Sequence, residues 1–287
     1  MPPDALELLD TLFLVLSFVL GTVVGSFLNV CICRLPKNES VVHPRSRCPK
    51  CGSGIAWYDN IPILSWLILG ARCRNCREPI SWQYPVVEGL TGLLFLGVYW
   101  RFGYTLATPI YMLLAAGLVL TTFIDLTDWT IPNEVTYPGI PLGVGLSVVG
   151  MFYPASGLLV QDVFHALGGV VLGGGILYLL DKVALVFWKK PGMGFGDVKL
   201  LAMLGAFLGV ISVPVIIMIS SLVGSVVGIT MVIMQKRRGV VSEGHYLPFG
   251  PYLALAGVIY LFFGQDLIDL YMGLMHIPQS TGVFPVQ

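Results

Sequence analysis

The sequence has little charge. Only 11% of its 287 residues are charged, while 56% are hydrophobic, and the formal net charge is zero. So few charges cannot keep the surface of a chain of this length in water, which excludes an ordinary soluble protein of one or two domains. The composition is typical of a membrane protein, and no nucleic-acid partner is expected.

The apolar residues fall in runs that approach the roughly 20 residues needed to cross a bilayer. We predict an all-α polytopic membrane protein with about eight transmembrane helices and a small zinc-stapled cytoplasmic insert between helices 1 and 2. The sixth and seventh runs are the hardest to separate. The eight runs are 8–33, 86–101, 108–125, 135–153, 163–188, 197–211, 213–235 and 248–264.

The first run lacks the features of a cleaved signal peptide. Asp4, Glu7 and Asp10 stand where a signal peptide has basic residues, and no small-residue cleavage site follows. We therefore expect a retained helix.

Lys and Arg gather in three segments, 34–77, 182–199 and 236–238. If eight helices alternate in direction, all three segments lie on one face, which the positive-inside rule makes cytoplasmic. Both termini then face outward. The same alternation brings Asp125 and Asp197 to the cytoplasmic face from helices that are distant in sequence.

The segment between the first two runs contains two CxxC motifs, CPKC at Cys48 and Cys51 and CRNC at Cys73 and Cys76. Two thiolate pairs at this separation predict a tetrahedral zinc site, whose metal replaces the core that so small a segment cannot build. Two disulfides are disfavoured in a reducing cytoplasm, and a redox motif lacks its usual βαβ context.

Other parts of this region are read as structural. Cys31 and Cys33 have no evident partner and are interpreted as packed small residues. The apolar block in YDNIPILSWLILG, which begins at Tyr58, is too short to span a bilayer, so we expect it to lie on the membrane face as a hairpin or helix.

Two aspartates stand at the ends of apolar runs, and a carboxylate at membrane depth is costly enough to suggest a function. Asp125 could instead cap a helix end, and Asp197 could be a first-turn acid stabilised by the helix dipole. Together, two carboxylates that share one proton supply a base and an acid at neutral pH. The pair predicts aspartic proteolysis.

Glycines precede Asp197 in the sequence GMGFGD. Gly194 and Gly196 remove side chains beside the acid, so that a substrate backbone can approach closely and the turn can adopt positive φ. The expected domains are the first transmembrane helix (1–33), a four-Cys zinc domain (34–85), a transmembrane aspartic protease core (86–264) and a C-terminal tail (265–287).

These motifs together resemble bacterial type IV prepilin leader peptidases that are also N-methyltransferases. The matching blocks are GSFLNVCICRLP from Gly25, the two CxxC pairs, YPVVEGL from Tyr84, FIDLTDWTIPN from Phe123, GMGFGDVKLLAMLGA from Gly192 and LPFGPYLALAG from Leu247. The GxGD element alone is shared with presenilin-like and archaeal preflagellin enzymes. The four-Cys insert and the GSFLNV block narrow the resemblance to the bacterial group.

The resemblance implies that Asp125 and Asp197 are the catalytic dyad. It also implies cleavage of prepilins and type II secretion pseudopilins after the Gly that ends a short basic leader, on the cytoplasmic side of the inner membrane. Methylation of the new N-terminus by S-adenosylmethionine would follow, and it rests on the resemblance alone because the chain has no Gly-rich loop in a Rossmann setting. Asn29 and Glu88 are candidate contributors to methylation. Asp128 and Glu134 are candidate ligands of the basic leader, although both also fit as ordinary loop charges.

Two other classes of protein fit parts of the pattern. An ion- or proton-coupled transporter could use the two aspartates as relay residues, but it predicts acids near the bilayer midplane and an inverted repeat that the sequence lacks. A non-enzymatic assembly scaffold with a zinc module would leave the glycine-flanked acid unexplained.

Overall fold

The computed structural model describes residues 3–189, 194–237 and 248–274. These residues are mostly helical, and the only β-type pairing among them is two isolated bridges. The chain divides into two compact units, Met1–Asp128 and Trp129–Gln287. The all-α class is therefore confirmed.

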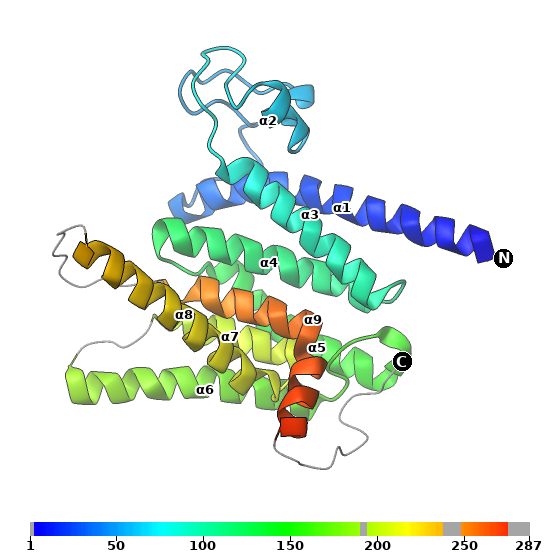
Figure 1. Ribbon diagram of the computed structural model, residues 1–287, viewed down its shortest axis with the longest axis vertical. Coiled ribbons are helices and arrows are strands. Elements are labelled where there is room, and N and C mark those ends of the chain that lie inside the picture. The colour runs from blue at the N-terminus through cyan, green and yellow to red at the C-terminus, as the bar shows by residue number, and fades with distance from the viewer. Residues whose placement is uncertain (1–2, 190–193, 238–247, 275–287) are drawn as a thin grey trace. The chain divides into compact units, whose positions relative to one another are not determined.

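The first unit contains three long helices and the insert (Figure 1). Helix α3 packs along α1 and also against α4. The insert holds only short elements between α1 and α3. The bounds are α1 (Pro3–Arg34), η1 (Leu35–Lys37), η2 (Trp57–Asn60), α2 (Leu64–Ile68), α3 (Gln83–Phe102) and α4 (Ala107–Asp128).

Small residues bring α1 and α3 together. A Cβ placed on Gly25 would lie 2.7 Å from the Cα of Glu88, and one on Gly21 would lie 2.7 Å from the carbonyl oxygen of Thr91. The two glycines are four residues apart, so both face α3. The α1 backbone therefore touches the α3 backbone directly.

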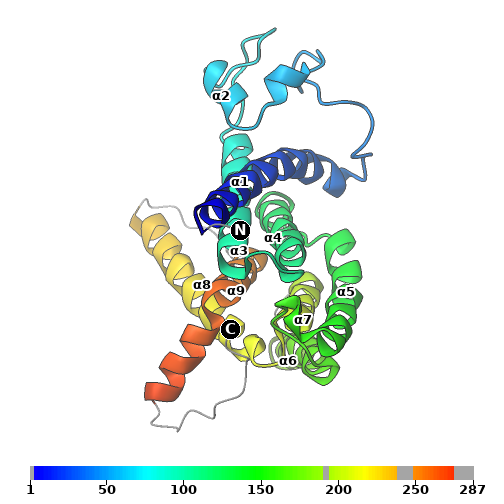
Figure 2. The same cartoon turned by 90° about the vertical axis from the view of Figure 1, so that its right-hand side faces the viewer.

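The second unit is built around α7 (Phe195–Leu208), the shortest of its described α-helices. Helix α7 contacts α5, α6, α8 and α9 (Figure 2), and every residue from Asp197 to Leu208 except Lys199 is buried. Because its neighbours cover it, α7 can be only 14 residues long without exposing polar backbone ends to lipid. The bounds are α5 (Asn133–Phe152), η3 (Pro154–Ser156), α6 (Val163–Trp188), α7 (Phe195–Leu208), α8 (Ser212–Arg237) and α9 (Gly250–Leu274).

Helices α6 and α7 meet at glycines. A Cβ on Gly169 would overlap the carbonyl group of Gly205, and a Cβ on Gly205 would overlap that of Gly169. One turn further along α6, a Cβ on Gly173 would lie 2.7 Å from the carbonyl oxygen of Leu201. This GxxxG spacing provides the close helix contact that membrane proteins use in place of a hydrophobic driving force.

All eight apolar runs are helical. Six helices of the described chain, α1, α4, α5, α6, α8 and α9, are long and apolar enough to cross a membrane. Helices α3 and α7 fall outside this group, so eight crossings stay a prediction. Helix α7 ends at Leu208 and α8 begins at Ser212, which separates the sixth and seventh runs, and α9 continues to Leu274, past residue 264.

The glycine contact can be tested by substitution within α6. We expect Gly169→Ala to destabilise the protein by about 1–3 kcal/mol, because the new methyl group overlaps backbone and must push α7 away. Gly175→Ala is the matched control, since a Cβ there meets nothing within 4 Å. Thermal unfolding in detergent micelles would measure both, and equal effects of the two substitutions would contradict the contact.

Candidate metal centre and candidate active-site aspartates

The two CxxC motifs adopt the same turn. The N–H of Cys48 donates to the carbonyl of Ser53, and the N–H of Cys73 donates to that of Glu78, both at 2.9 Å. In each turn, the residue after the second cysteine has positive φ, 71° at Gly52 and 60° at Arg77. Each turn points its two thiols inward from one short loop.

A β-type bridge closes each turn. Arg47 pairs with Gly54 in the first motif, and Arg72 pairs with Pro79 in the second. Each bridge joins the residue before the first cysteine to the third residue after the second. The insert therefore contains two copies of one small metal-binding turn, a relation that the cysteine spacing alone does not show.

The four thiols come together in space. The sulfur atoms of Cys48, Cys51, Cys73 and Cys76 all lie within 4.8 Å of one another, and Cys48 Sγ lies 3.8 Å from Cys76 Sγ. A tetrahedral thiolate site with metal–sulfur bonds of about 2.3 Å has sulfur–sulfur edges of about 3.8 Å. The cluster thus has both the chemistry and the dimensions to hold a metal ion.

Hydrogen bonds favour the thiolate form of two ligands. The Ser53 hydroxyl, 2.8 Å from Cys51 Sγ, lowers the pKa of the Cys51 thiol to about 6, with help from the Ser53 backbone. The backbone N–H groups of Cys76 and Asn75 lower the pKa of Cys73. The Glu78 backbone acts to lower the pKa of Cys76, but burial and the neighbouring thiols together raise it to about 12. Because metals bind the thiolate, the contacts to Cys51 and Cys73 favour ion binding at those two ligands.

A charged pair ties the second turn to the segment between the motifs. Arg74 donates two hydrogen bonds to the Asp59 carboxylate, at 2.7 and 2.6 Å. The guanidinium also lies over the Tyr58 ring, 5.5 Å from its centroid. The Arg74 side chain lowers the pKa of Asp59, mainly through these hydrogen bonds. The segment around η2 is therefore attached to the metal-binding turn.

Glu88 anchors the insert to α3. This side chain is buried, and its Oε2 accepts a hydrogen bond of 2.7 Å from the N–H of Ile63. Ile63 has φ 61° and ψ −52°, and the N–H of Leu64 donates to the carbonyl of Pro62 at 2.6 Å. This is a strained γ-turn, which persists only when its surroundings hold it.

Asn29 lies one turn beyond Gly25 on α1 and is 1% exposed. Its Nδ2 donates to the carbonyls of Gly25, at 3.3 Å, and Tyr84, at 3.2 Å. Its Oδ1 is buried and has no hydrogen-bond partner within the part of the chain that the structure describes. Such a buried acceptor without a partner is unusual in a folded protein.

Asp125 lies in the last turn of α4 and is only 5% exposed. Thr121 stands one turn earlier on the same face and is also buried. Its hydroxyl oxygen has no hydrogen-bond partner among the described residues. Sequence reasoning missed Thr121, although its spacing of four residues from Asp125 is a signal for a shared helix face.

Asp197 lies in the first turn of α7 and is 8% exposed. Gly194 is the N-cap residue, with φ −72°, and neither it nor Gly196 has positive φ, so that part of the prediction is wrong. A Cβ on Gly194 would have Asp197 Oδ2 as its nearest neighbour, at 3.5 Å. The turn therefore leaves room beside the acid at Gly194.

The space beside Gly196 is occupied, unlike that beside Gly194. A Cβ at this position would lie 2.9 Å from the Cβ of Ile131, so the space beside Gly196 is filled by the chain itself. Lys199, on the next turn of α7, contacts the Asn133 side chain and lies over the Tyr137 ring, 4.8 Å from its centroid. These contacts pack the start of α7 against the start of α5.

The remaining candidates are exposed. Asp128 ends α4 and accepts a hydrogen bond of 2.7 Å from the Thr127 hydroxyl, while Glu134 lies in the first turn of α5. Asp125 and Asp128 belong to the first compact unit, and Asp197 and Glu134 to the second. The meeting of Asp125 with Asp197 stays a prediction.

Comparison with known proteins places both units in a family. Residues 19–102 match the bacterial peptidase A24 N-terminal domain, and residues 112–229 match the type IV leader peptidase family. The chain belongs to the type IV leader peptidase family, which confirms the resemblance seen in the sequence. No solved structure matches the chain.

Several curated relatives carry the name prepilin leader peptidase/N-methyltransferase. One from Myxococcus xanthus is 45% identical over 81% of this chain and 67% of its own length. A relative from Stutzerimonas stutzeri is 36% identical over 91% of this chain and 94% of its own length. A relative from Neisseria gonorrhoeae is also 36% identical, over 92% of this chain and 94% of its own length. The transporter alternative receives no support from these relatives.

The positive φ of Gly52 predicts a specific cost in the metal centre. Ala at this position meets no neighbour within 4 Å but must adopt a left-handed backbone, which costs about 1–2 kcal/mol. We expect Gly52→Ala to speed metal transfer to a chromogenic chelator by roughly fivefold to thirtyfold. Gly54→Ala, which is equally open but lacks positive φ, should leave the rate unchanged, and equal rates for both variants would contradict this interpretation.

Proposed function

We propose that this protein cleaves the short basic leader from type IV prepilins and type II secretion pseudopilins after a Gly, and then methylates the new N-terminal residue. The observation that carries the proposal is a pair of buried carboxylates in a chain with very little charge. Asp125 and Asp197 are 5% and 8% exposed, each at the end of a helix within a segment that matches the peptidase family. Burial of this kind is costly and is typical of intramembrane catalytic acids.

The two acids would form a dyad with one shared proton. One carboxylate takes a proton from water as the water oxygen attacks the carbonyl carbon of the Gly, and the other acid donates its proton to the carbonyl oxygen. When the C–N bond breaks, the first acid returns its proton to the leaving amine, and the second regains one from the diol. Both residues end in their starting states, so no metal is consumed or required for this step.

The positions of the two acids at helix ends support an assignment of their roles. A negative charge is favoured at a helix N-terminus and disfavoured at a C-terminus, typically by about 0.3–1 kcal/mol. Asp197 lies in the first turn of α7 and Asp125 in the last turn of α4. We therefore assign Asp197 as the base and Asp125 as the acid, with the Thr121 hydroxyl helping to hold the attacking water.

Four further residues would shape substrate binding. Gly194 leaves space beside the Asp197 carboxylate for an extended backbone, and Gly196 admits Ile131 and so fixes the start of α7. The exposed carboxylates of Asp128 and Glu134 would attract the basic leader. A prepilin N-terminal helix is itself apolar and could dock from within the bilayer.

For methylation, S-adenosylmethionine would supply an electrophilic methyl group that the new amine attacks. Asn29 is supported as a contributor by its buried Oδ1, an acceptor that a ligand's N–H or O–H could satisfy. Glu88 would act by holding the insert through Ile63.

The metal of the four-Cys cluster is proposed to be zinc, in a structural role. All four positions of a tetrahedral ion would be filled by Cys48, Cys51, Cys73 and Cys76, which leaves no open position for substrate. The protein is a multi-pass membrane protein. We place it in the bacterial inner membrane, with the insert and both aspartates on the cytoplasmic face and both termini in the periplasm.

Substitution of each aspartate tests the peptidase. We expect Asp125→Asn and Asp197→Asn each to lower cleavage of a full-length prepilin roughly a thousandfold or more, because an amide can neither give nor accept the proton. Asp269→Asn, an exposed position on α9, should retain full activity. Mass spectrometry of the pilin product would measure cleavage.

The same variants separate the two activities. Given a pilin peptide that already has its mature N-terminus, and S-adenosylmethionine, both Asp variants should still add a methyl group. Retained cleavage in either variant would remove that residue from the chemistry. Loss of methylation as well would indicate a folding defect, which thermal unfolding would then reveal.

Elemental analysis tests the zinc assignment. We expect purified protein to contain zinc equimolar with the chain, and Cys48→Ser to lose most of it, since three thiolates hold the ion less tightly than four. Cys33→Ser is the control, because this cysteine lies outside the cluster and, contrary to the packing expected from the sequence, is exposed. Another metal in the wild type, or unchanged zinc in Cys48→Ser, would contradict the assignment.

A further inference from the structure

The insert exposes an unusually apolar surface at α2. Leu64, Leu67 and Ile68 are 56%, 60% and 79% exposed, and two flanking indoles, Trp57 and Trp82, are 81% and 70% exposed. A unit this small gains little from its core, so large apolar side chains left in water would be a liability. We call these five residues the apolar face of the insert.

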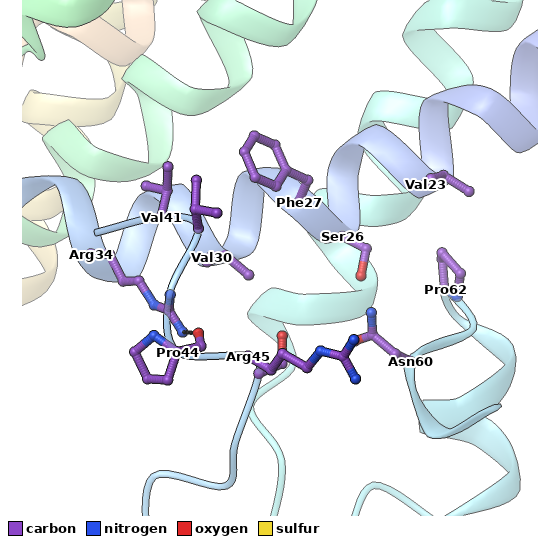
Figure 3. A pocket seen from close by; sticks show the side chains of 12 residues that line it. Val23, Ser26, Phe27, Val30, Arg34, Val41, Pro44, Arg45, Asn60 and Pro62 are labelled. Carbon is purple, nitrogen blue, oxygen red and sulfur yellow. Dashed lines mark hydrogen bonds between the residues drawn. The ribbon is translucent and has the colours of Figure 1, made fainter. Parts of the chain in front are cut away.

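The chain just before α2 lies beside α1 rather than beyond its end. Asn60 and Pro62 line a cavity of about 370 Å³ together with Val23, Ser26 and Phe27 of α1 (Figure 3). Ser26 stands eight residues before the end of α1 at Arg34, which is about 12 Å along a helix. The chain entering α2 therefore lies alongside the apolar run of a helix that is long enough to cross a membrane.

Contacts with α3 hold the α2 segment from a second side. Glu88 lies five residues after the start of α3 at Gln83, and its carboxylate accepts a hydrogen bond of 2.7 Å from the N–H of Ile63. The Trp66 and Trp82 rings pack with centroids 4.2 Å apart. The α2 segment is thus attached to the start of α3 at two points and cannot move far from it.

The two helices that hold the insert expose apolar side chains of their own. Val23 and Phe27 on α1 are 53% and 52% exposed, and Val86 and Leu90 on α3 are 49% and 39% exposed. Residues of this kind on membrane helices face acyl chains. The insert is therefore held by two helices whose exposed apolar residues would themselves contact lipid.

The backbone of α2 is also suited to a membrane interface. The N–H groups of Ser65, Leu67 and Leu69 donate to the carbonyls of Ile61, Ile63 and Ser65 at 2.9–3.1 Å. The Ser65 hydroxyl donates to the Ile61 carbonyl at 2.6 Å. Polar backbone groups that are satisfied within the segment can leave water at little cost.

We propose that α2 is an interfacial anchor, seated in the boundary between headgroups and acyl chains of the bilayer that the protein spans. Leu64, Leu67 and Ile68 contact acyl chains, while the amphipathic indoles of Trp57 and Trp82 lie at headgroup level. The four-Cys cluster is thereby held against the membrane surface and does not move as a free domain. This proposal does not depend on the proposed proteolysis.

Fluorescence quenching tests directly whether α2 lies at the membrane interface. A small environment-sensitive fluorescent amino acid would replace Ile68 or Leu67 in the full chain, reconstituted into vesicles. Two control positions are Leu16, which is exposed on α1, and Lys50, which is exposed on the first metal-binding turn. Brominated phospholipid acyl chains report lipid contact, and iodide reports contact with water.

We expect bromolipid to quench the probes at 67 and 68 about as strongly as the probe at 16, and iodide to quench them roughly threefold less than the probe at 50. Metal content equal to that of the parent protein confirms that the insert is folded. Strong iodide quenching at 67 and 68 would show that the face is open to water. Protection from both quenchers would show that protein covers it. Either result overturns the proposal.

Discussion

Direct contact between helix backbones at glycine is the constraint on which the rest of the structure depends. In lipid, apolar side chains gain little by leaving one apolar environment for another, so helices associate through close packing. Gly169 and Gly205 bring α6 against α7, which lets α7 be short, buried and surrounded. Gly25 brings α1 against Glu88, which places that carboxylate where it can hold the insert. Both candidate centres therefore rely on positions without side chains.

The chain has few charged residues, and its buried carboxylates differ in their positions and contacts. Glu88 holds a backbone N–H of the insert, whereas Asp125 and Asp197 lie at the ends of α4 and α7. An acid within a membrane protein must be balanced by a partner or by function. Glu88 shows that burial alone does not identify a catalytic acid. Asp197 differs from Glu88 in its position at a helix end beside a glycine.

Much of this could be predicted from the sequence, because hydropathy and cysteine spacing are local properties. The apolar runs located every long helix, and the CxxC pairs located the cluster. Contacts between distant segments could not be predicted. Nothing near Gly196 indicates that Ile131 fills its space, and nothing near Glu88 indicates that its partner is the N–H of Ile63. The expected positive φ failed because Gly194 and Gly196 serve close packing and helix capping rather than a left-handed turn.

Backbone strain in the insert is a cost that a bound metal would offset. Ile63, Ala71 and Arg77 all have positive φ, which costs each residue about 1–2 kcal/mol. A segment whose large apolar side chains are mostly exposed gains little burial energy to offset several kcal/mol of strain. A structural zinc ion in a four-thiolate site contributes about 10–16 kcal/mol of folding free energy, which exceeds that strain by a wide margin. The insert can therefore keep unfavourable backbone conformations at the places where they direct thiols inward and where Ile63 meets Glu88.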